Sequence, residues 1–309
     1  MTVKPTKTII AFCLSGLILT GCSLPGLSGP SQQTIRIGTM VTSESEILGQ
    51  IVALLIEEET DLQTELITKL GSSVVQHQAL VQGDLDITAA RYTGTDLSAA
   101  LGMDPVTDRD EAMDIVKREF SERFDQTWFD SYGFENTYAL SVTEAFADEH
   151  GIETISDLEA FAPELRFGVD NSWVNRKGDG YQGFQESYFA FGNVFPMNVG
   201  LVYEANASGH MDVVLAYSSD GRIQEYNLKV LEDDRRFFPP YDASPVVRNE
   251  VLEQYPELSP LLERLTGTIT TEKMQELNYM ADVELKNPRL VAQTFLEENN
   301  YFKDKEESH

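Results

Sequence analysis

Short apolar segments of strand length alternate with longer segments of helical periodicity between residues 34 and 298 of this chain. Strands are predicted at residues 34–38, 62–67, 86–90, 138–142, 165–169, 211–217 and 228–231. Helices are predicted at residues 43–55, 73–82, 108–124, 183–191, 251–255, 258–265, 271–285 and 288–298. Strands interleaved with helices predict the α/β class with mainly parallel sheets, and we find no internal repeat in the sequence.

Two of the predicted helices carry recognisable ends. Ser43 and Glu46 have the spacing of a capping box, just before the periodic apolar positions that start at Ile47. Ser72 or Ser73 is expected to cap the helix that runs to residue 82. Gly83 is expected to end it, because glycine readily adopts the left-handed backbone conformation that terminates helices.

The N-terminus has the pattern of a secretion signal. Residues 1–7 carry two lysines and no acid, and residues 8–19 form an apolar run that ends in Leu19-Thr20-Gly21-Cys22. This end resembles the lipobox of bacterial lipoproteins, which implies that residues 1–21 are removed and that Cys22 is lipidated. The alternative is an ordinary secretory signal with a chance cysteine. Residues 22–33 are rich in Ser, Gly and Pro and are predicted to be a flexible tether. The expected location is the outer face of the cytoplasmic membrane, anchored at Cys22.

Charge and cysteine content exclude several classes of protein. Lys+Arg number 23 against 51 Asp+Glu, a net charge of −28, which would repel nucleic acid. An acidic surface favours neutral or cationic small ligands, although many secreted proteins are acidic for solubility alone. The chain has only 2 cysteines, too few for a disulfide scaffold or a cysteine-rich zinc module. We therefore expect no nucleic-acid partner and no metal.

Catalytic and cofactor motifs are mostly absent. We find no GxSxG, HExxH, P-loop or EF-hand pattern, and none of the 4 histidines has metal-ligand spacing with another. Gly178, Gly180 and Gly183 match GxGxxG, but a polar segment precedes them instead of a buried strand, so no dinucleotide or other cofactor is expected. A hydrolase that uses Ser72 or Ser73 with His77 is conceivable. The simpler interpretation of His77 is an imidazole on a helix surface.

Four tyrosines fall at strand ends or turns instead of on a helical stripe: Tyr92, Tyr138, Tyr217 and Tyr241. Loops that follow strand ends are where α/β proteins place ligand contacts. The face of an aromatic ring is negative, so several rings can surround a cation that offers no hydrogen-bond donor. These residues thus predict a site for a quaternary ammonium group, with ordinary amphipathic packing as the alternative.

Longer segments resemble a known family. The sequences IRIGTMVTSESEILGQ, RYTGTDL, AYSSDGRI and DDRRFFPPY are similar to those of the substrate-binding lipoproteins of osmoprotectant ABC importers, of the glycine betaine/carnitine/choline type. The resemblance covers nearly all of residues 34–302. It implies a two-lobed, periplasmic-binding-protein-like (type II) fold with a ligand cleft between the lobes. It also implies that the four tyrosines form a cage and that Thr95 faces the ligand.

Two positions depart from the family pattern. Met40 stands where relatives often carry Gln, so a polar partner of the ligand is lost or replaced there. Trp173 is a second departure, to which the sequence assigns no role. Thr95 adds no charge to the site, which suits ligands with or without a carboxylate.

The resemblance also implies domain limits. One lobe would comprise residues 34–137 together with 241–309, and the other would comprise residues 138–240. The chain would then cross twice between the lobes, near Tyr138 and Pro239, and these crossings would form a hinge.

The predicted function is capture of quaternary ammonium compatible solutes, such as glycine betaine, carnitine and choline, by a monomeric binding protein without enzymatic activity. The protein would deliver them to a separate permease driven by its own ATPase. A binding protein for another solute, such as an amino acid, is the nearest alternative, followed by the hydrolase and by a purely structural surface lipoprotein. An amino-acid site needs a cationic partner for the carboxylate, and Arg91, next to Tyr92, is expected to point away from the site.

Overall fold

The computed structural model describes residues 34–171, 173–176 and 178–302. These residues belong to one compact unit, Gln33–His309. The predicted signal segment, the tether and Cys22 lie outside the described residues. Within the described ranges, no helix combines the length and the apolar character that crossing a membrane requires.

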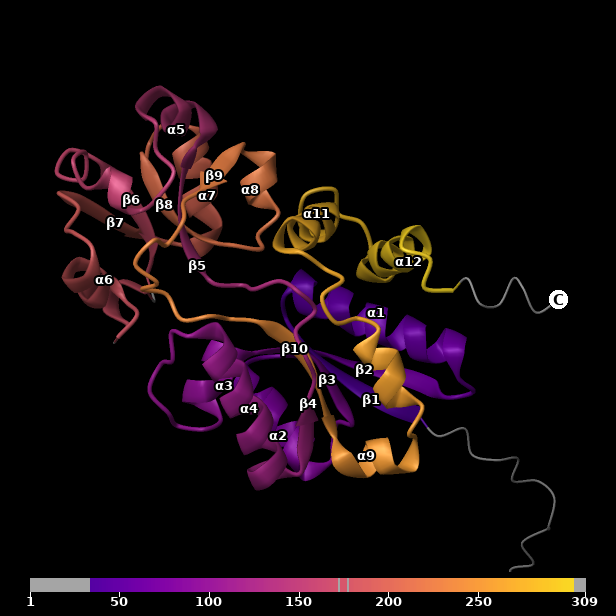
Figure 1. The fold of residues 1–309 in the computed structure, drawn as a ribbon. Helices are drawn as coiled ribbons and strands as arrows, with labels where there is room; N and C mark the ends of the chain where they lie inside the picture. The colour runs from indigo at the N-terminus through magenta and orange to yellow at the C-terminus, as the bar shows by residue number, and fades with distance from the viewer. Residues whose placement is uncertain (1–33, 172, 177, 303–309) are drawn as a thin grey trace, which may run out of the picture. The chain divides into compact units, whose positions relative to one another are not determined.

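The unit contains two five-stranded sheets flanked by helices (Figure 1). The first sheet has the strand order β2-β1-β3-β10-β4. Its strands are β1 (Thr34–Met40), β2 (Gln63–Leu70), β3 (Ile87–Tyr92), β4 (Gln126–Trp128) and β10 (Ala243–Arg248). The second sheet has the order β7-β6-β8-β5-β9. Its strands are β5 (Tyr138–Thr143), β6 (Arg166–Asp170), β7 (Asn193–Met197), β8 (Val213–Tyr217) and β9 (Leu228–Val230).

The prediction of mainly parallel sheets is wrong, because each sheet is mixed. In the first sheet β1 runs parallel to β2 and β3, whereas β10 runs antiparallel to β3 and β4. In the second sheet β6 runs parallel to β7 and β8, whereas β5 runs antiparallel to β8 and β9. The reason is the path of the chain. Strands β5 and β10 each arrive from the other sheet, and they enter at the edge where their parallel neighbours end.

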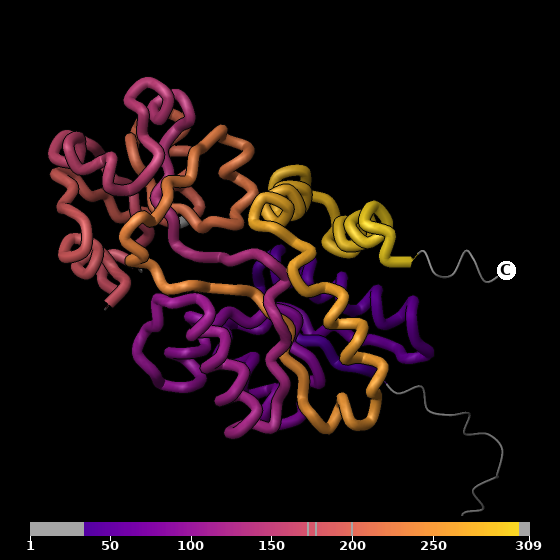
Figure 2. Tube along the Cα trace, viewed as in Figure 1, coloured from indigo at the N-terminus to yellow at the C-terminus, as the bar shows by residue number. Residues whose placement is uncertain are grey.

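The two segments that connect the sheets lie side by side. Glu135 and Asp242 form an isolated antiparallel bridge, and the Asn136 amide donates to the Tyr241 carbonyl at 3.1 Å. Figure 2 shows these two segments together between the sheets. Tyr138 and Tyr241 therefore lie next to this connection, Tyr138 as the first residue of β5 and Tyr241 two residues before β10.

Helices cover the sheets. Those that follow first-sheet strands are α1 (Ser43–Glu59), α2 (Ser73–Gln82), α3 (Thr93–Ala99), α4 (Arg109–Phe124), α9 (Asn249–Gln254), α10 (Leu258–Glu263), α11 (Thr271–Asp282) and α12 (Pro288–Glu298). The others are α5 (Glu144–His150), α6 (Tyr181–Ser187), α7 (Val199–Ala207), α8 (Arg222–Glu225) and the 3₁₀ helices Ser156–Leu158 and Trp173–Asn175. Residues 47–56 of α1, apart from the half-buried Gln50, are buried because the sheet covers one face and α10, α11 and α12 cover the other.

Helix ends follow the capping rules, with local exceptions. Ser72 caps α2 and Gly83 ends it with a φ of 78°, as predicted. Helix α1 is instead capped by Thr42, whose hydroxyl accepts from the Ser45 amide, so the prediction of Ser43 as the cap is wrong by one residue. The helix predicted over residues 183–191 corresponds to α6, which ends earlier, at Ser187. Tyr188 leaves the helical conformation, and its hydroxyl donates a hydrogen bond to Asp233 at 2.5 Å.

The structure also contains an internal repeat that we did not find in the sequence. In the first sheet the Arg36 amide and guanidinium both donate to Asp86, and in the second sheet Arg166 makes the same bonds to Asp212. Each arginine lies two residues before a glycine that pairs with the neighbouring parallel strand, Gly38 with Thr88 and Gly168 with Val214. The two sheets therefore share the same strand order and the same arginine–aspartate pair. Few identical residues mark this repeat in the sequence.

Candidate binding site

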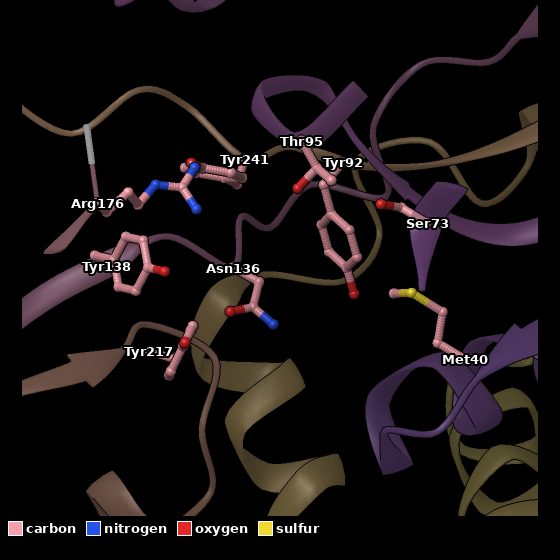
Figure 3. A pocket seen from close by; sticks show the side chains of 9 residues that line it. All are labelled: Met40, Ser73, Tyr92, Thr95, Asn136, Tyr138, Arg176, Tyr217 and Tyr241. Atoms are coloured by element: carbon pink, nitrogen blue, oxygen red, sulfur yellow. The ribbon is translucent and has the colours of Figure 1, made fainter. Parts of the chain in front are cut away.

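A cavity of about 200 Å³ lies at the edge where the parallel strands of both sheets end. Figure 3 shows its lining side chains: Met40, Ser73, Tyr92, Thr95, Asn136, Tyr138, Arg176, Tyr217 and Tyr241. The structure thus brings together Thr95 and all four tyrosines singled out in the sequence. Their role as ligand contacts stays a prediction.

Three of the tyrosine rings form a group around Tyr138. Tyr138 opposes Tyr217 across the antiparallel pair of β5 and β8, and their ring centroids are 5.2 Å apart. The Tyr241 ring meets the Tyr138 ring edge-on at 6.4 Å. Tyr92, the last residue of β3, faces this group across the cavity (Figure 3).

A glycine allows Tyr241 to approach the first sheet closely. A Cβ atom at Gly94 would lie 2.7 Å from the Pro240 carbonyl oxygen and 3.1 Å from the Tyr241 ring. Any larger residue at this position would push the segment that carries Tyr241 away from α3. The glycine in RYTGTDL therefore contributes to the geometry of the cavity.

The tyrosine hydroxyls are neutral at physiological pH. Burial raises the pKa of Tyr138, Tyr217 and Tyr241 above the ordinary value of 10.0. Burial, and then the nearby Glu44 carboxylate, raise the pKa of Tyr92 well above that value. The rings consequently present the negative faces of neutral phenols, which attract cations.

Arg176 brings a positive charge into the cavity, and our sequence reasoning missed it. Its Nε donates to Asp179 at 2.6 Å, its Nη2 donates to the Tyr241 hydroxyl at 3.0 Å, and its guanidinium carbon lies 5.7 Å from the centre of the Tyr138 ring. Arg176 belongs to none of the tyrosine segments and lies in the polar stretch around Trp173, which fits no predicted element.

Trp173 supports the cavity from behind. It is fully buried, and its ring packs 6.4 Å from that of Tyr138 and 6.2 Å from that of Phe238. Its indole N–H donates to the Asp179 carbonyl at 2.7 Å. Trp173 therefore fixes the turn that carries Asp179, which in turn holds both Arg176 and the Tyr241 hydroxyl.

The family to which these features correspond is identified by comparison with known proteins. A family model for the substrate-binding domain of ABC-type glycine betaine transport systems matches residues 33–298. The chain belongs to this family.

Relatives match nearly the whole chain. The carnitine transport binding protein OpuCC of Listeria monocytogenes is 53% identical over 292 residues, which cover 94% of this chain and 95% of the relative. A glycine-betaine-binding protein of Pseudomonas aeruginosa is 32% identical over 310 residues, 96% of each chain. A crystal structure described as a glycine betaine/carnitine/choline ABC transporter has a TM-score of 0.85 at 49% identity, covering 87% of this chain and 99% of that one.

Membership of this family confirms the predicted α/β, two-lobed fold and the absence of an enzymatic role. The chain is a substrate-binding protein of an ABC importer and acts outside the cytoplasm. Among the described residues, no group of three or more His, Cys, Asp or Glu side chains has the arrangement of a metal site.

The hydrolase alternative has no support in this binding protein, and the prediction of His77 as a surface residue is wrong. His77 is only 6% exposed, and its ring packs edge-on against Phe124 at 4.5 Å and Phe120 at 5.6 Å. The apolar face of α4 covers this side of α2, which the helical pattern of α2 alone does not reveal. The Ser72 hydroxyl is engaged in capping α2.

His77 predicts a pH dependence of stability. Burial, and then the Arg91 charge, lower the pKa of His77 below its ordinary value of 6.5. The unfolded chain therefore binds the proton more readily, so this group stabilises the fold above about pH 6.5 and ceases to do so as the pH falls. We expect His77→Phe to reduce the loss of melting temperature between pH 7.5 and pH 5. His150→Phe, at an exposed histidine, should leave that loss unchanged; an equal effect of both variants would contradict the assignment.

Arg91 points away from the cavity, as the alternation of a strand requires. Its guanidinium forms a fully buried ion pair with Asp96 and lies over the Phe120 ring, with its carbon 5.4 Å from the ring centre. Arg176 is thus the only arginine among the described residues that line the cavity.

Proposed function

We propose that this chain captures quaternary ammonium compatible solutes in the cavity lined by Tyr92, Tyr138, Tyr217 and Tyr241. The observation that carries the proposal is the presence of these four rings and one guanidinium around a single small cavity. The rings would hold the methylated nitrogen by cation–π attraction, each contact contributing about 0.5–2 kcal/mol. Two relatives are named as binding proteins for carnitine and for glycine betaine, and these names point to the same class of ligand.

Arg176 is the proposed partner of the ligand's carboxylate. Glycine betaine and carnitine both carry a carboxylate, and arginine binds this group through paired N–H donors. Thr95 would add a hydroxyl contact at the same end. Met40 lines the opposite wall, where its thioether is an apolar surface for the methyl groups.

The amino-acid alternative lacks a partner for the ammonium group. A primary ammonium needs hydrogen-bond acceptors with negative charge, and none of the described residues that line the cavity is Asp or Glu. A trimethylated nitrogen has no N–H to satisfy, so the tyrosine faces suit it better.

The proposed function also involves closure of the two lobes around the ligand and delivery of the ligand to a permease. The lobes would comprise residues 34–137 with 241–309, and residues 138–240, with the paired segments near Glu135 and Asp242 as the hinge. Tyr138 and Tyr241 adjoin that hinge, so closure around a cation would complete the cage. A lipid at Cys22 would hold the protein near its permease.

A pair of ligands of the same shape tests the function. Calorimetric titration of residues 34–309 should give binding of glycine betaine and carnitine. The carbon analogue 3,3-dimethylbutanoate, which keeps the carboxylate and replaces the charged nitrogen by carbon, should bind at least tenfold more weakly. Proline, whose ammonium group carries N–H donors instead of three methyl groups, is the control ligand and should bind more weakly than glycine betaine. Equal affinity for betaine and its carbon analogue would contradict the cation–π cage.

A further inference from the structure

Glu44 is a buried carboxylate that links the cavity to distant parts of the chain. It lies in the first turn of α1 and is only 4% exposed. Its Oε1 accepts from the Tyr92 hydroxyl at 2.5 Å and from Asn136 Nδ2 at 2.9 Å. Its Oε2 accepts from the Ser219 hydroxyl at 2.5 Å and from Asn278 Nδ2 at 3.1 Å. Neutral donors alone thus hold a buried charge, an arrangement that is stable only while all of them stay in place.

These donors come from both sheets. Tyr92 ends β3 of the first sheet, whereas Ser219 follows β8 of the second sheet by two residues. Asn278, on α11, donates both to Glu44 and to the Ser219 carbonyl at 2.8 Å. Gly221 lies so close to α11 that a Cβ there would stand 2.4 Å from the Tyr279 nitrogen. Glu44 therefore sets the position of Tyr92 relative to the loop that follows Tyr217.

The carboxylate also sets the orientation of two groups that line the cavity. A carboxylate only accepts hydrogen bonds, so the Asn136 amide must turn its nitrogen toward Glu44 and its oxygen away. In Figure 3 that oxygen points toward Tyr138 and Tyr217, and no hydrogen-bond partner satisfies it within the described structure. The Tyr92 hydroxyl likewise directs its proton to Glu44, and donation to a carboxylate makes the phenol more electron-rich.

We propose that Glu44 is a positioning residue for the cation. It does not line the cavity, but it arranges Tyr92 and the Asn136 oxygen to face the ligand and joins them to the Ser219 loop. It also adds a negative charge behind the Tyr92 ring. This inference rests on the proposed function, since it concerns the same ligand.

Glu44→Gln tests the proposal, because glutamine keeps the size but turns one acceptor into a donor that opposes Asn278. We expect glycine betaine to bind about tenfold more weakly, while 3,3-dimethylbutanoate, which has no cation, loses little affinity. A purely structural role would weaken both ligands equally and would overturn the proposal. Glu46→Gln, in the same turn of α1 but partly exposed, is the matched control and should bind as the wild type does.

Double variants test whether Glu44 acts through Tyr92. Tyr92→Phe keeps the ring and removes the hydroxyl, so its combination with Glu44→Gln should bind no more weakly than Glu44→Gln alone. Additive losses would overturn the proposal. If Glu44→Gln does not fold, Tyr92→Phe and Ser219→Ala carry the test, each with an expected loss of about threefold. Wild-type protein that binds none of the quaternary ammonium ligands would refute the proposed function itself, whereas wild-type binding with unaffected variants would refute only the role of Glu44.

Discussion

Replacement of Arg176 by glutamine is expected to weaken the binding of glycine betaine and carnitine by about 10-fold to 100-fold, and to leave choline binding unchanged or stronger. A hydrogen bond to a charged group contributes roughly 1.5–3 kcal/mol, which corresponds to this range of affinity. The guanidinium attracts the carboxylate of betaine and carnitine. It repels the cation of every ligand, and choline has no carboxylate to compensate. The same substitution is therefore expected to weaken the binding of betaine and carnitine without weakening the binding of choline.

Calorimetric titration with the three ligands measures this change of specificity. Arg166→Gln is the control, because Arg166 also pairs with an aspartate in the second sheet but lies outside the cavity. Its affinities should match those of the wild type. A parallel loss for betaine, carnitine and choline in Arg176→Gln would show that Arg176 supports the cavity without contacting the carboxylate.

The tyrosines could be found from the sequence because strand ends are local features. Each of Tyr92, Tyr138 and Tyr217 begins or ends a segment with a clear strand pattern, and strand ends of an α/β fold meet at one edge. Strand ends can be identified from the pattern of the surrounding residues alone. They indicate which rings share an edge of the sheet, although not how the rings are oriented.

Arg176 and Glu44 could not be found in this way, since their positions depend on contacts between distant residues. Arg176 belongs to an irregular segment that is fixed by the burial of Trp173 and by Asp179. In the sequence Glu44 is an ordinary acidic residue in the first turn of a predicted helix. An acidic side chain stabilises the N-terminus of any helix, so this position alone indicates no special role. In the fold it is buried among hydrogen-bond donors from distant parts of the chain, one of which, Asn278, lies 234 residues further along.

The direction of the strands was missed for a similar reason. Local patterns identified β5 as a strand, but its direction follows from the first passage of the chain between the sheets, after β4. Strand β10 was not predicted at all, because ASPVVR contains a proline and lacks a clean alternation. Its place in the first sheet is determined by pairing with β3 and β4.

Tyr138→Ala should have the largest effect of the single tyrosine replacements, weakening glycine betaine binding by about 30-fold to 100-fold. Tyr138 is the one cage residue whose ring contacts two others, Tyr217 at 5.2 Å and Tyr241 at 6.4 Å. Its loss removes a cation–π contact of up to about 2 kcal/mol. It also leaves both neighbouring rings without the surface that orients them, so part of their contribution is lost too.

The conservative variant separates the ring from its hydroxyl. Tyr138→Phe keeps the aromatic face, and we expect its affinity for betaine to stay within about threefold of the wild type. Tyr226→Ala, at the C-cap of α8 and outside the cavity, controls for the loss of a ring that packs near the second sheet. Thermal unfolding of each variant verifies that the protein is folded at the temperature of titration. If Tyr138→Ala bound betaine as tightly as Tyr138→Phe, the aromatic face would not hold the cation, because the two variants differ chiefly in that face.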